Sequence, residues 1–415
     1  MLASPHLAAA QRAFQTVLPP KVAAPIDSAL LRQSAKAVAR PEYQNSRFAE
    51  SWLRRPPRGG GWDDPLKHID IARGDVVHLT LSGSYRWRSE FNTNYMMSNA
   101  PAAQDQFAAS RLLLAGDFRV GRLTGPYARA FAEYRDAQAF NRTLPGRLTT
   151  KELDRADFQN AFLEAGSGAY GVRYGRQEMS VGKERFVGVS DWSNARRAFH
   201  GVRAFGRVGP AVLDVSDVRV MSVRSLAWNF PDSTSRFRTV ALSSRADRPA
   251  ALTFRPASWH AYYLDYRAEV GARHERRMVG LRSGWRTPLA IGGGQAAIDA
   301  EVGTQRGYVG AKPLEAWFHA VEATMTFKAV RYSPMLQLAL DRGSGTKGGA
   351  DPRAGTLSTM YGSAHSYDGI ADVFGVANLR IARLVGGAEL ARWLQLRTAV
   401  RSYRRVELGD GVYSK

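Results

Sequence analysis

Three arginines near the end of the sequence have the spacing of a ligand-binding row. Arg397, Arg401 and Arg405 lie four residues apart in the stretch LQLRTAVRSYRR at 394–405. A guanidinium group binds a carboxylate or a phosphate through two parallel hydrogen bonds, so such a row could hold an anionic ligand. A spacing of four residues puts all three on one face of either a helix or a strand. What the row can do therefore depends on the element that carries it.

The stretch is compatible with both elements. As a helix, it would have an apolar stripe that includes Leu396 and Val400, and the arginines would lie on a solvated flank. As a strand, it would place Leu394, Leu396 and Val400 on one face and the arginines on the other, together with Gln395 and Tyr403. In a strand, the three arginines would form a row of positive charges on one face of the sheet.

The composition indicates an anionic partner. The chain of 415 residues has 58 Lys+Arg against 37 Asp+Glu, a net charge of +21 and an isoelectric point near 10.5. Nine of the 58 basic residues are lysines and 49 are arginines. Cysteine is absent, which excludes disulfides, zinc-thiolate sites and cysteine nucleophiles. His200 and His319 have no partner at metal-ligand spacing, so we expect neither a metal site nor a cofactor.

The sequence has no stretch that approaches 18 consecutive apolar residues. This excludes a transmembrane helix but not a membrane β-barrel. The N-terminal MLASPHLAAAQRAF lacks the basic start and long apolar core of a signal peptide. Either the start is incomplete or the protein is cytosolic. We expect residues 1–70 to form an N-terminal leader or periplasmic segment that is partly flexible, and residues 71–415 to form the main domain.

From about His78 the hydrophobic pattern switches to period two. In LTLSGSYRWRSE, Leu81, Tyr85 and Trp87 alternate with polar residues that include Arg86 and Arg88. About fifteen strands are predicted, the first from His78 and the others near 109–121, 126–139, 155–166, 169–182, 197–209, 211–223, 236–244, 257–268, 274–286, 294–305, 315–329, 333–342, 376–386 and 393–405. Short links and longer loops alternate between them, as in an antiparallel up-and-down transmembrane β-barrel.

The alternation alone does not separate a membrane barrel from a soluble β-sandwich, because both have one apolar and one polar face. Tyrosine and tryptophan near strand ends favour the barrel, where they form girdles at the membrane interfaces. The stretch YGVRYGRQE changes phase near Gly175, which predicts a bulge or a strand end there.

Several motifs resemble those of one protein family. The stretch YGRQEMSVGKERFVGVSDWSNARRAFHGVR at 174–203 resembles the signature of the alginate export family of outer-membrane porins, with Gly-Arg-Gln-Glu leaving a strand and Asn-x-x-Arg-x-Phe-x-Gly entering the next. RFAESWLRRPPRGGGWDDPLKHI, EYRDAQAF, RADFQNAFLEAG, DGIADVFGVANLR and DGVYS are similar to further landmarks in the family's order. The resemblance covers roughly residues 47–414.

The resemblance implies an all-β barrel of 18 strands in the outer membrane of a Gram-negative bacterium. It implies a narrow, electropositive lumen that passes an anionic exopolysaccharide such as alginate, a polyuronate, and it favours the strand for 394–405. Outer-membrane lipid and periplasmic secretion components would be its partners. In the family further strands follow the DGVYS segment, and an odd strand count would leave an unpaired edge in lipid. We therefore expect this chain to lack the last strands of its barrel.

A lumen that moves a polyuronate needs many weak cationic contacts in series. The alternation assigns ten arginines to the lumen, and the resemblance adds Arg176. The expected pore-lining residues are Arg86, Arg88, Arg129, Arg135, Arg173, Arg176, Arg197, Arg203, Arg282, Arg397 and Arg401. We expect no catalytic residues.

Other functions stay open from the sequence. A general anion-selective porin for small acidic solutes would have the same arginines. An outer-membrane barrel enzyme, such as a lipid hydrolase, would need a serine or threonine beside a histidine, and the sequence has no G-x-S-x-G motif. A soluble nucleic-acid binder would cluster basic residues with exposed aromatics on one patch, whereas these arginines recur on nearly every strand. We therefore expect no nucleic-acid partner.

Overall fold

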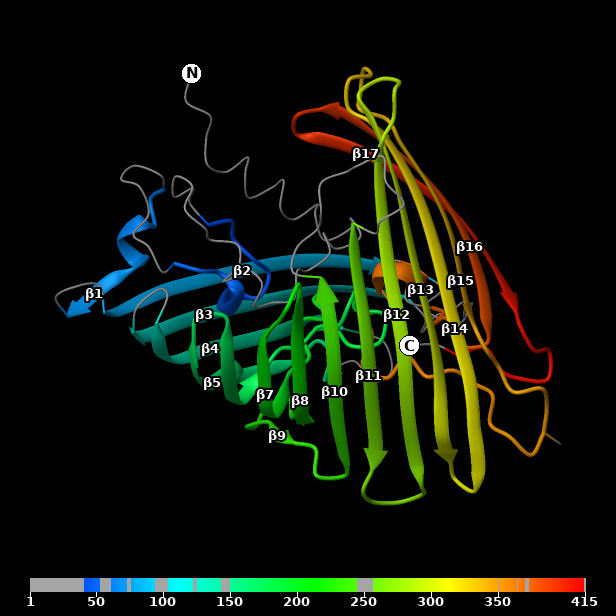
Figure 1. Ribbon diagram of the computed structural model, residues 1–415, viewed down its shortest axis with the longest axis horizontal. Coiled ribbons are helices and arrows are strands. Elements are labelled where there is room, and N and C mark those ends of the chain that lie inside the picture. The colour runs from blue at the N-terminus through cyan, green and yellow to red at the C-terminus, as the bar shows by residue number, and fades with distance from the viewer. Residues whose placement is uncertain are drawn as a thin grey trace. The chain divides into compact units, whose positions relative to one another are not determined.

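The computed structural model is built almost entirely of antiparallel β-strands (Figure 1). It describes residues 41–52, 61–72, 76–93, 104–121, 125–142, 150–244, 257–349, 351–363, 365–369 and 373–413. Helical structure in these residues is limited to short turns, which are η2 (Arg47–Ala49), η3 (Asp64–Leu66) and α3 (His365–Asp368). None of the helices in the described parts is long and apolar enough to span a membrane.

The described residues form seventeen strands. Two of them, β1 (Ile69–Ala72) and β9 (Phe230–Pro231), have only four and two residues. The others are β2 (Val77–Asn92), β3 (Asp105–Gly121), β4 (Pro126–Phe140), β5 (Asp154–Ser167), β6 (Tyr170–Gln177), β7 (Phe199–Val208), β8 (Ala211–Ser222), β10 (Ser235–Ser244), β11 (Ser258–Ala268), β12 (His274–Pro288), β13 (Gly294–Val309), β14 (Lys312–Phe327), β15 (Met335–Gly343), β16 (Leu379–Ala391) and β17 (Leu394–Arg405). These long strands correspond one to one to the fifteen that the alternation predicts, so the all-β antiparallel fold is confirmed.

Several of the predicted boundaries are wrong. Strand β3 begins at Asp105 rather than at 109, β13 ends at Val309 rather than at 305, and β16 runs over Leu379–Ala391 rather than 376–386. Strand β6 ends at Gln177 rather than at 182, and β7 begins at Phe199 rather than at 197. The intervening residues 178–198 leave the sheet and pack on its face, where their polar groups bind side chains instead of a neighbouring strand. The apolar residues in this segment, which favour a strand locally, are used for that packing.

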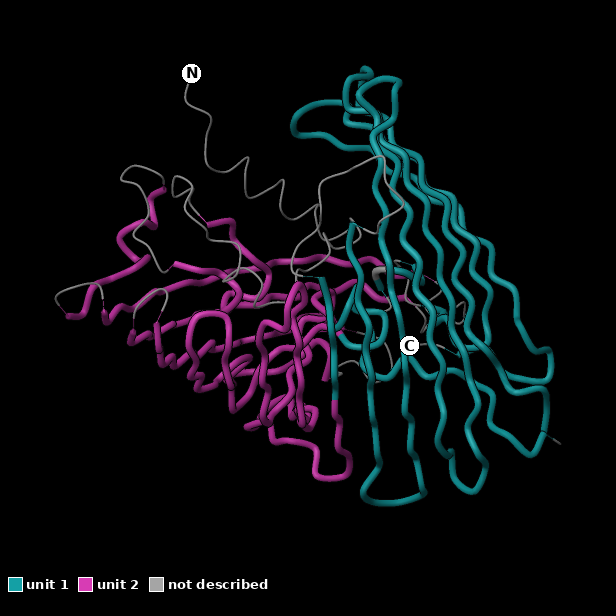
Figure 2. Tube along the Cα trace, viewed as in Figure 1, with its two compact units in different colours: residues 1–23, 181–187, 239–415 teal, residues 24–180, 188–238 magenta. Residues whose placement is uncertain are grey.

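The chain divides into two compact units (Figure 2). Unit 2 comprises residues 24–180 and 188–238 and holds β1 to β9, in which each strand from β2 to β8 pairs with the next in antiparallel register. Gly175 and Gly201 lie opposite each other in the β6–β7 pair with φ of +131° and +150°. A Cβ atom would lie 2.4 Å from the Ala161 carbonyl oxygen at Gly175 and 2.3 Å from that of Asp217 at Gly201. The register of β6 with both neighbours is regular through Gly175 and burial alternates without a break, so the predicted change of phase does not occur there. The strand ends two residues later, at Gln177.

Unit 1 comprises residues 1–23, 181–187 and 239–415, and β10 starts before its boundary. Strands β11 to β17 pair consecutively and antiparallel. Residues 181–187 lie against this sheet and contact the β15–β16 connection, since the Phe186 carbonyl accepts from the Tyr361 amide at 3.0 Å. The stretch 394–405 is the strand β17, as the resemblance implies.

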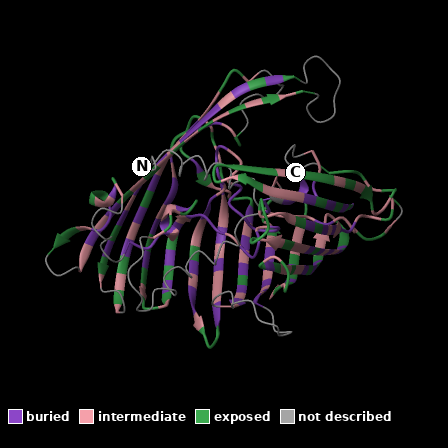
Figure 3. Ribbon diagram, turned by 90° about the horizontal axis from the view of Figure 1, so that it is seen from above, coloured by how far each residue is buried: buried purple, intermediate pink, exposed green. Residues whose placement is uncertain are grey.

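Burial alternates along the strands (Figure 3). Many of the buried positions carry polar residues. On β15, Gln337 and Asp341 are 4% and 1% exposed, whereas Leu336 and Leu338 are 46% and 56% exposed. A soluble sandwich would bury the leucines and expose the polar residues. The inverted pattern is that of a sheet whose outer face contacts lipid, which resolves the ambiguity of the sequence.

The predicted division at residue 70 stays a prediction. Residues 41–52 and 61–72, which fall in the predicted leader, belong to unit 2 and include buried Phe48 and Trp52. The first forty residues lie outside the described part of the chain.

Candidate functional site

Ten of the eleven predicted pore arginines lie in strands. They are Arg86 and Arg88 on β2, Arg129 and Arg135 on β4, Arg173 and Arg176 on β6, Arg203 on β7, Arg282 on β12, and Arg397 and Arg401 on β17. Arg197 instead precedes β7 and donates to the Gly188 carbonyl at 2.9 Å, so it belongs to the segment 178–198. Eight of the eleven fall in unit 2 and three in unit 1, and each unit has its own arrangement of charges.

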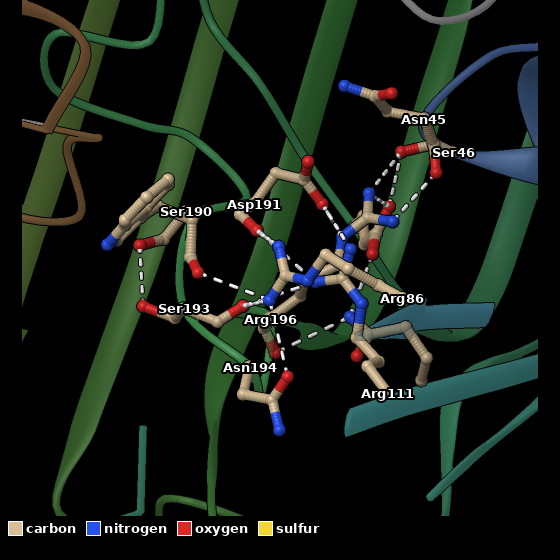
Figure 4. Close-up of polar contacts among 12 residues, drawn as sticks. Asn45, Ser46, Arg86, Arg111, Ser190, Asp191, Ser193, Asn194 and Arg196 are labelled. Carbon is tan, nitrogen blue, oxygen red and sulfur yellow. Dashed lines mark hydrogen bonds and ion pairs between the residues drawn. The ribbon is translucent and has the colours of Figure 1, made fainter. Parts of the chain in front are cut away.

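In unit 2, residues 188–198 bring an acidic group to the arginines of β2 and β3 (Figure 4). The Asp191 carbonyl accepts from Arg86 at 2.8 Å, and its carboxylate accepts from Arg111 at 2.8 Å. Arg196 places its Nε 3.4 Å from the same carboxylate. Three guanidinium groups thus converge on one aspartate.

Asn194 fixes the position of this segment. Its side-chain amide is fully buried and donates to the carbonyls of Ser110, Gln138 and Glu152 at 2.8 to 3.0 Å. Its Oδ1 accepts from Arg86 at 3.3 Å. Asn194 is the asparagine of the Asn-x-x-Arg motif, so the motif has a structural role in holding the segment on the sheet.

Arg88 lies beside this cluster and is half-buried. It donates to the Trp192 carbonyl at 2.6 Å, stacks on the Trp192 ring at 4.4 Å and pairs with Glu90 at 2.5 Å. Its charge is therefore compensated by a carboxylate on its own strand.

The arginines of β4, β6 and β7 are buried in ion pairs. Arg129 bonds Asp117 at 2.7 Å, Arg135 pairs with Asp154, Arg173 pairs with Glu164, and Arg203 bonds Asp214 at 2.9 Å. These four arginines are at most 3% exposed. Most of their charge is thus neutralised by neighbouring acids, and they make up a structural wall.

Arg176 has a different position from Arg173. Burial alternates regularly along β6, with Arg173 in the buried phase and Arg176 in the other. Arg176 bonds Asp157 at 2.7 Å and the Asn229 carbonyl at 2.9 Å. Next to it on β7 is His200, whose ring contacts exposed Tyr174 at 5.4 Å. Arg176 therefore lies on the face of β6 opposite to that of Arg173, whereas the alternation and the resemblance together predict that both line the lumen.

In unit 1 the charges are reversed, because the sheet supplies acids and residues 181–187 supply cations. Lys183 lies 3.3 Å from Asp299 and 3.5 Å from Glu322. Arg185 lies 3.4 Å from Glu301 and 3.2 Å from Asp341. The predicted Arg282 also bonds Asp299, with its Nε at 3.1 Å.

Arg397 and Arg401 differ from the other predicted arginines. Both are half-buried on one face of β17, and Arg401 is directly opposite Arg383 in the β16–β17 register. Arg383 bonds Glu322 at 3.1 Å and the Tyr367 carbonyl at 2.7 Å. Within the described part of the chain, Arg397 Nη1 and Arg401 Nε are buried without a hydrogen-bond partner, and neither residue has an ion pair.

Three groups in the segment 178–198, Asp191, Arg185 and Glu178, have shifted pKa values. Burial alone would raise the pKa of Asp191, but Arg111, Arg196 and Arg86 outweigh it and hold that pKa well below its ordinary range. Burial would lower the pKa of Arg185, but Asp341 and the other nearby acidic groups raise it above the ordinary value. Burial raises the pKa of Glu178 to about 7 although Arg196 opposes the shift.

Sequence reasoning missed Arg111, Lys183, Arg185, Arg196 and Arg383. Arg111 and Arg383 lie in predicted strands, but the local pattern around each mixes apolar and small residues on both faces. The other three lie in segment 178–198, whose inward packing no local pattern indicates. No group of three or more His, Asp or Glu side chains suited to a metal ion occurs in the described residues.

Comparisons with known proteins identify a family. The sequence profile described as alginate export matches residues 77–415. None of the curated protein sequences matches the chain. The chain is similar in structure to Pseudomonas aeruginosa OccK5 (OpdH), with a TM-score of 0.49 and 12% identity over 82% of this chain and 84% of that one. It is also similar to Pseudomonas aeruginosa OccK2 (OpdF) in complex with glucuronate, with a TM-score of 0.47 and 12% identity over 75% of this chain and 74% of that one.

Proposed function

The chain belongs to the alginate export family and is an outer-membrane protein of the Gram-negative type, and from this premise we propose that it passes an anionic polysaccharide such as a polyuronate through an arginine-lined channel. The polar face of the sheet would line the channel, and the exposed apolar face would contact lipid. The family match and the inverted burial pattern support a channel rather than an enzyme.

The observation that carries the proposal is the state of Arg397 and Arg401. The other predicted arginines are held by carboxylates or by carbonyl oxygens, although several of them also have one buried nitrogen without a partner. Among the described residues, Arg397 and Arg401 have neither a side-chain hydrogen bond nor an ion pair. A buried guanidinium without a partner is costly, and a passing carboxylate would relieve that cost. Their Cα atoms are four residues apart on one strand, so they offer two successive contacts along the direction of β17.

Partial neutralisation of the remaining arginines suits transport. A wall of unpaired arginines would bind a polyanion tightly and block its movement, because conduction requires contacts that are favourable but weak. The paired arginines of β4, β6 and β7 would keep the wall polar, and each would bind a carboxylate more weakly than an unpaired arginine because a neighbouring acid already neutralises part of its charge.

Ionic current through the protein in a planar bilayer tests the proposal. We expect anion-selective current that a soluble polyuronate blocks, and weaker selectivity and weaker block for the double variant Arg397→Gln and Arg401→Gln. Arg404→Gln is the matched control, because Arg404 lies on the same strand but in the opposite, exposed phase. Equal effects of both changes would contradict a special role for the two arginines.

The second candidate is an anion-selective porin for small acidic solutes. The same unpaired arginines would serve it, since a single carboxylate needs only one of them. Current that remains anion-selective but is indifferent to the polyuronate would favour this candidate. Current without anion selectivity from a correctly folded protein would contradict both.

A further inference from the structure

Residues 41–52, with the sequence PEYQNSRFAESW, lie on the sheet face of unit 2 without joining the sheet. Arg129, Phe131 and Arg135 share the buried phase of β4, and all three lie on the face that this segment and residues 188–198 cover. The segment thus covers part of the sheet face that would line the proposed channel.

An aromatic site holds the centre of the segment. Phe48 is 2% exposed, and its ring lies edge-on to Phe131 at 5.9 Å and to Phe162 at 5.6 Å. The guanidinium of Arg173 lies 4.9 Å from the Phe48 ring. One phenylalanine therefore fills a site built from three strands, β4, β5 and β6.

Two arginines bind the backbone of the segment. Arg196 donates to the Asn45 carbonyl at 2.7 Å and to the Ser46 hydroxyl at 2.9 Å (Figure 4). Arg129 donates to the Phe48 carbonyl at 2.8 Å. Glu178 accepts from the Ser46 hydroxyl. These contacts use guanidinium N–H groups, which are the same donors that an anionic cargo would seek.

The segment also has internal contacts of its own. Residues Arg47–Ala49 form the turn η2, and Glu50 accepts from the Gln44 amide at 2.9 Å and from the Trp52 indole at 3.0 Å. Because no ladder of backbone hydrogen bonds joins it to a strand among the described residues, it could leave the face without breaking the sheet. A short, internally closed segment with one buried aromatic anchor has the form of a bound peptide.

We propose that Arg129, Arg173, Arg196, Glu178 and the Phe131–Phe162 pair form a peptide-binding site on the channel face, and that residues 41–52 occupy it as a plug that anionic cargo displaces. The plug acts in two ways. It fills space on the conducting face, and its carbonyl oxygens occupy arginine donors until a polyanion competes for them. This role rests on the proposed channel function, whereas the binding site itself does not.

The test uses a full-length variant in which residues 41–52 are replaced by glycine and serine, and a fluorescent peptide with the sequence of residues 41–52. We expect the peptide to bind this variant, measured by fluorescence anisotropy in detergent, and to bind the unchanged protein far more weakly because the site is filled. A peptide with Phe48→Ala should bind at least about tenfold more weakly, since it loses the buried anchor. A soluble polyuronate should release the bound peptide, and neutral dextran should not.

The same variant is then compared in a planar bilayer. We expect a larger conductance than that of the unchanged protein, and addition of the peptide should restore the lower value. Phe48→Ala in the otherwise unchanged chain is a milder second variant for the case that the larger replacement fails to fold. We expect its conductance to exceed that of the unchanged protein. Absence of peptide binding to the folded variant would overturn the site, and unchanged conductance with intact peptide binding would overturn the plug. A channel without current but with specific peptide binding would refute the proposed function and leave the site standing.

Discussion

The negative charge of Asp191 offsets part of the positive charge of the arginines on β2 and β3. Its carboxylate accepts from Arg111 at 2.8 Å and lies 3.4 Å from Arg196, while its backbone carbonyl holds Arg86. Asp191→Asn keeps the backbone contacts and the shape of the side chain but removes one negative charge. We expect the local potential to become more positive and polyanion binding to strengthen.

The size of the effect follows from Coulomb's law. For a cargo carboxylate about 8 Å from Asp191, one unit charge contributes between about 0.5 kcal/mol at the dielectric of water and about 2 kcal/mol at an effective dielectric of 20. Removing the repulsion should therefore lower the Kd of polyuronate block by about two- to thirty-fold. The half-buried position of Arg86 favours the upper part of this range.

The assay is the concentration dependence of polyuronate block at two salt concentrations. Asp217→Asn is the control, because Asp217 also pairs with two arginines, Arg236 and Arg238, but its side chain is 40% exposed. Solvent screens such a pair, so we expect little change in block. Weaker block by Asp191→Asn in a protein that folds normally would refute the electrostatic reasoning, because it would mean that Asp191 acts by holding the arginines in place.

Three further predictions concern stability, measured as the urea midpoint of unfolding from lipid vesicles. Glu164→Gln leaves the fully buried Arg173 without its charged partner and should cost about 3 kcal/mol, well beyond the effect of Asp217→Asn; equal effects would contradict it. Because the pKa of Glu178 is raised to about 7, the folded protein keeps a proton that the unfolded chain releases above its ordinary pKa of 4.5, so the free energy of unfolding falls as the pH rises from 4.5 to 7. Glu178→Gln should remove this pH dependence, and a slope retained in the variant would refute the assignment. Gly201→Ala should cost about 1–3 kcal/mol because of its φ of +150° and its close approach to Asp217, whereas Gly116→Ala, with nothing within 4 Å, should be tolerated; similar midpoints would count against the strain.

The strands could be predicted from the sequence because each carries its own signal. Period-two alternation is local, and it located all fifteen long strands, including β17 with its arginine row. The short strands β1 and β9 were missed since four and two residues are too few for a period to be visible. The ends of β6 and β7 were misplaced because segment 178–198 has apolar residues that pack on the sheet face rather than in a strand.

The sequence predicted which residues carry the charges of the site, but not how these residues pair with one another. Alternation placed Arg129, Arg173 and Arg282 on the polar face, but it could not show which acid each arginine meets. Those partners lie on neighbouring strands or in segment 178–198, and their positions depend on register and on tertiary packing. Arg197 is an example. The alternation placed it on the polar face of a strand, but β7 begins two residues later, at Phe199.

Segment 178–198 carries opposite charges where it meets the strands of the two units. Residues 181–187 bring Lys183 and Arg185 to the acids of unit 1, whereas residues 188–198 bring Asp191 to arginines of unit 2. The like charges of each sheet face would repel one another if this segment were removed, so its charge pattern stabilises both faces.

This compensation would also limit where a cargo binds in the proposed channel. Since neighbouring acids neutralise many of the buried arginines, the net charge of +21 supplies a general attraction for anions rather than a continuous strong binding surface. In the proposed channel, specific contacts would then fall to arginines without an ion pair among the described residues, such as Arg397 and Arg401 on one face of β17. Sparse contacts of this kind bind a polyanion weakly enough to let it move, and that is the property a conducting channel requires.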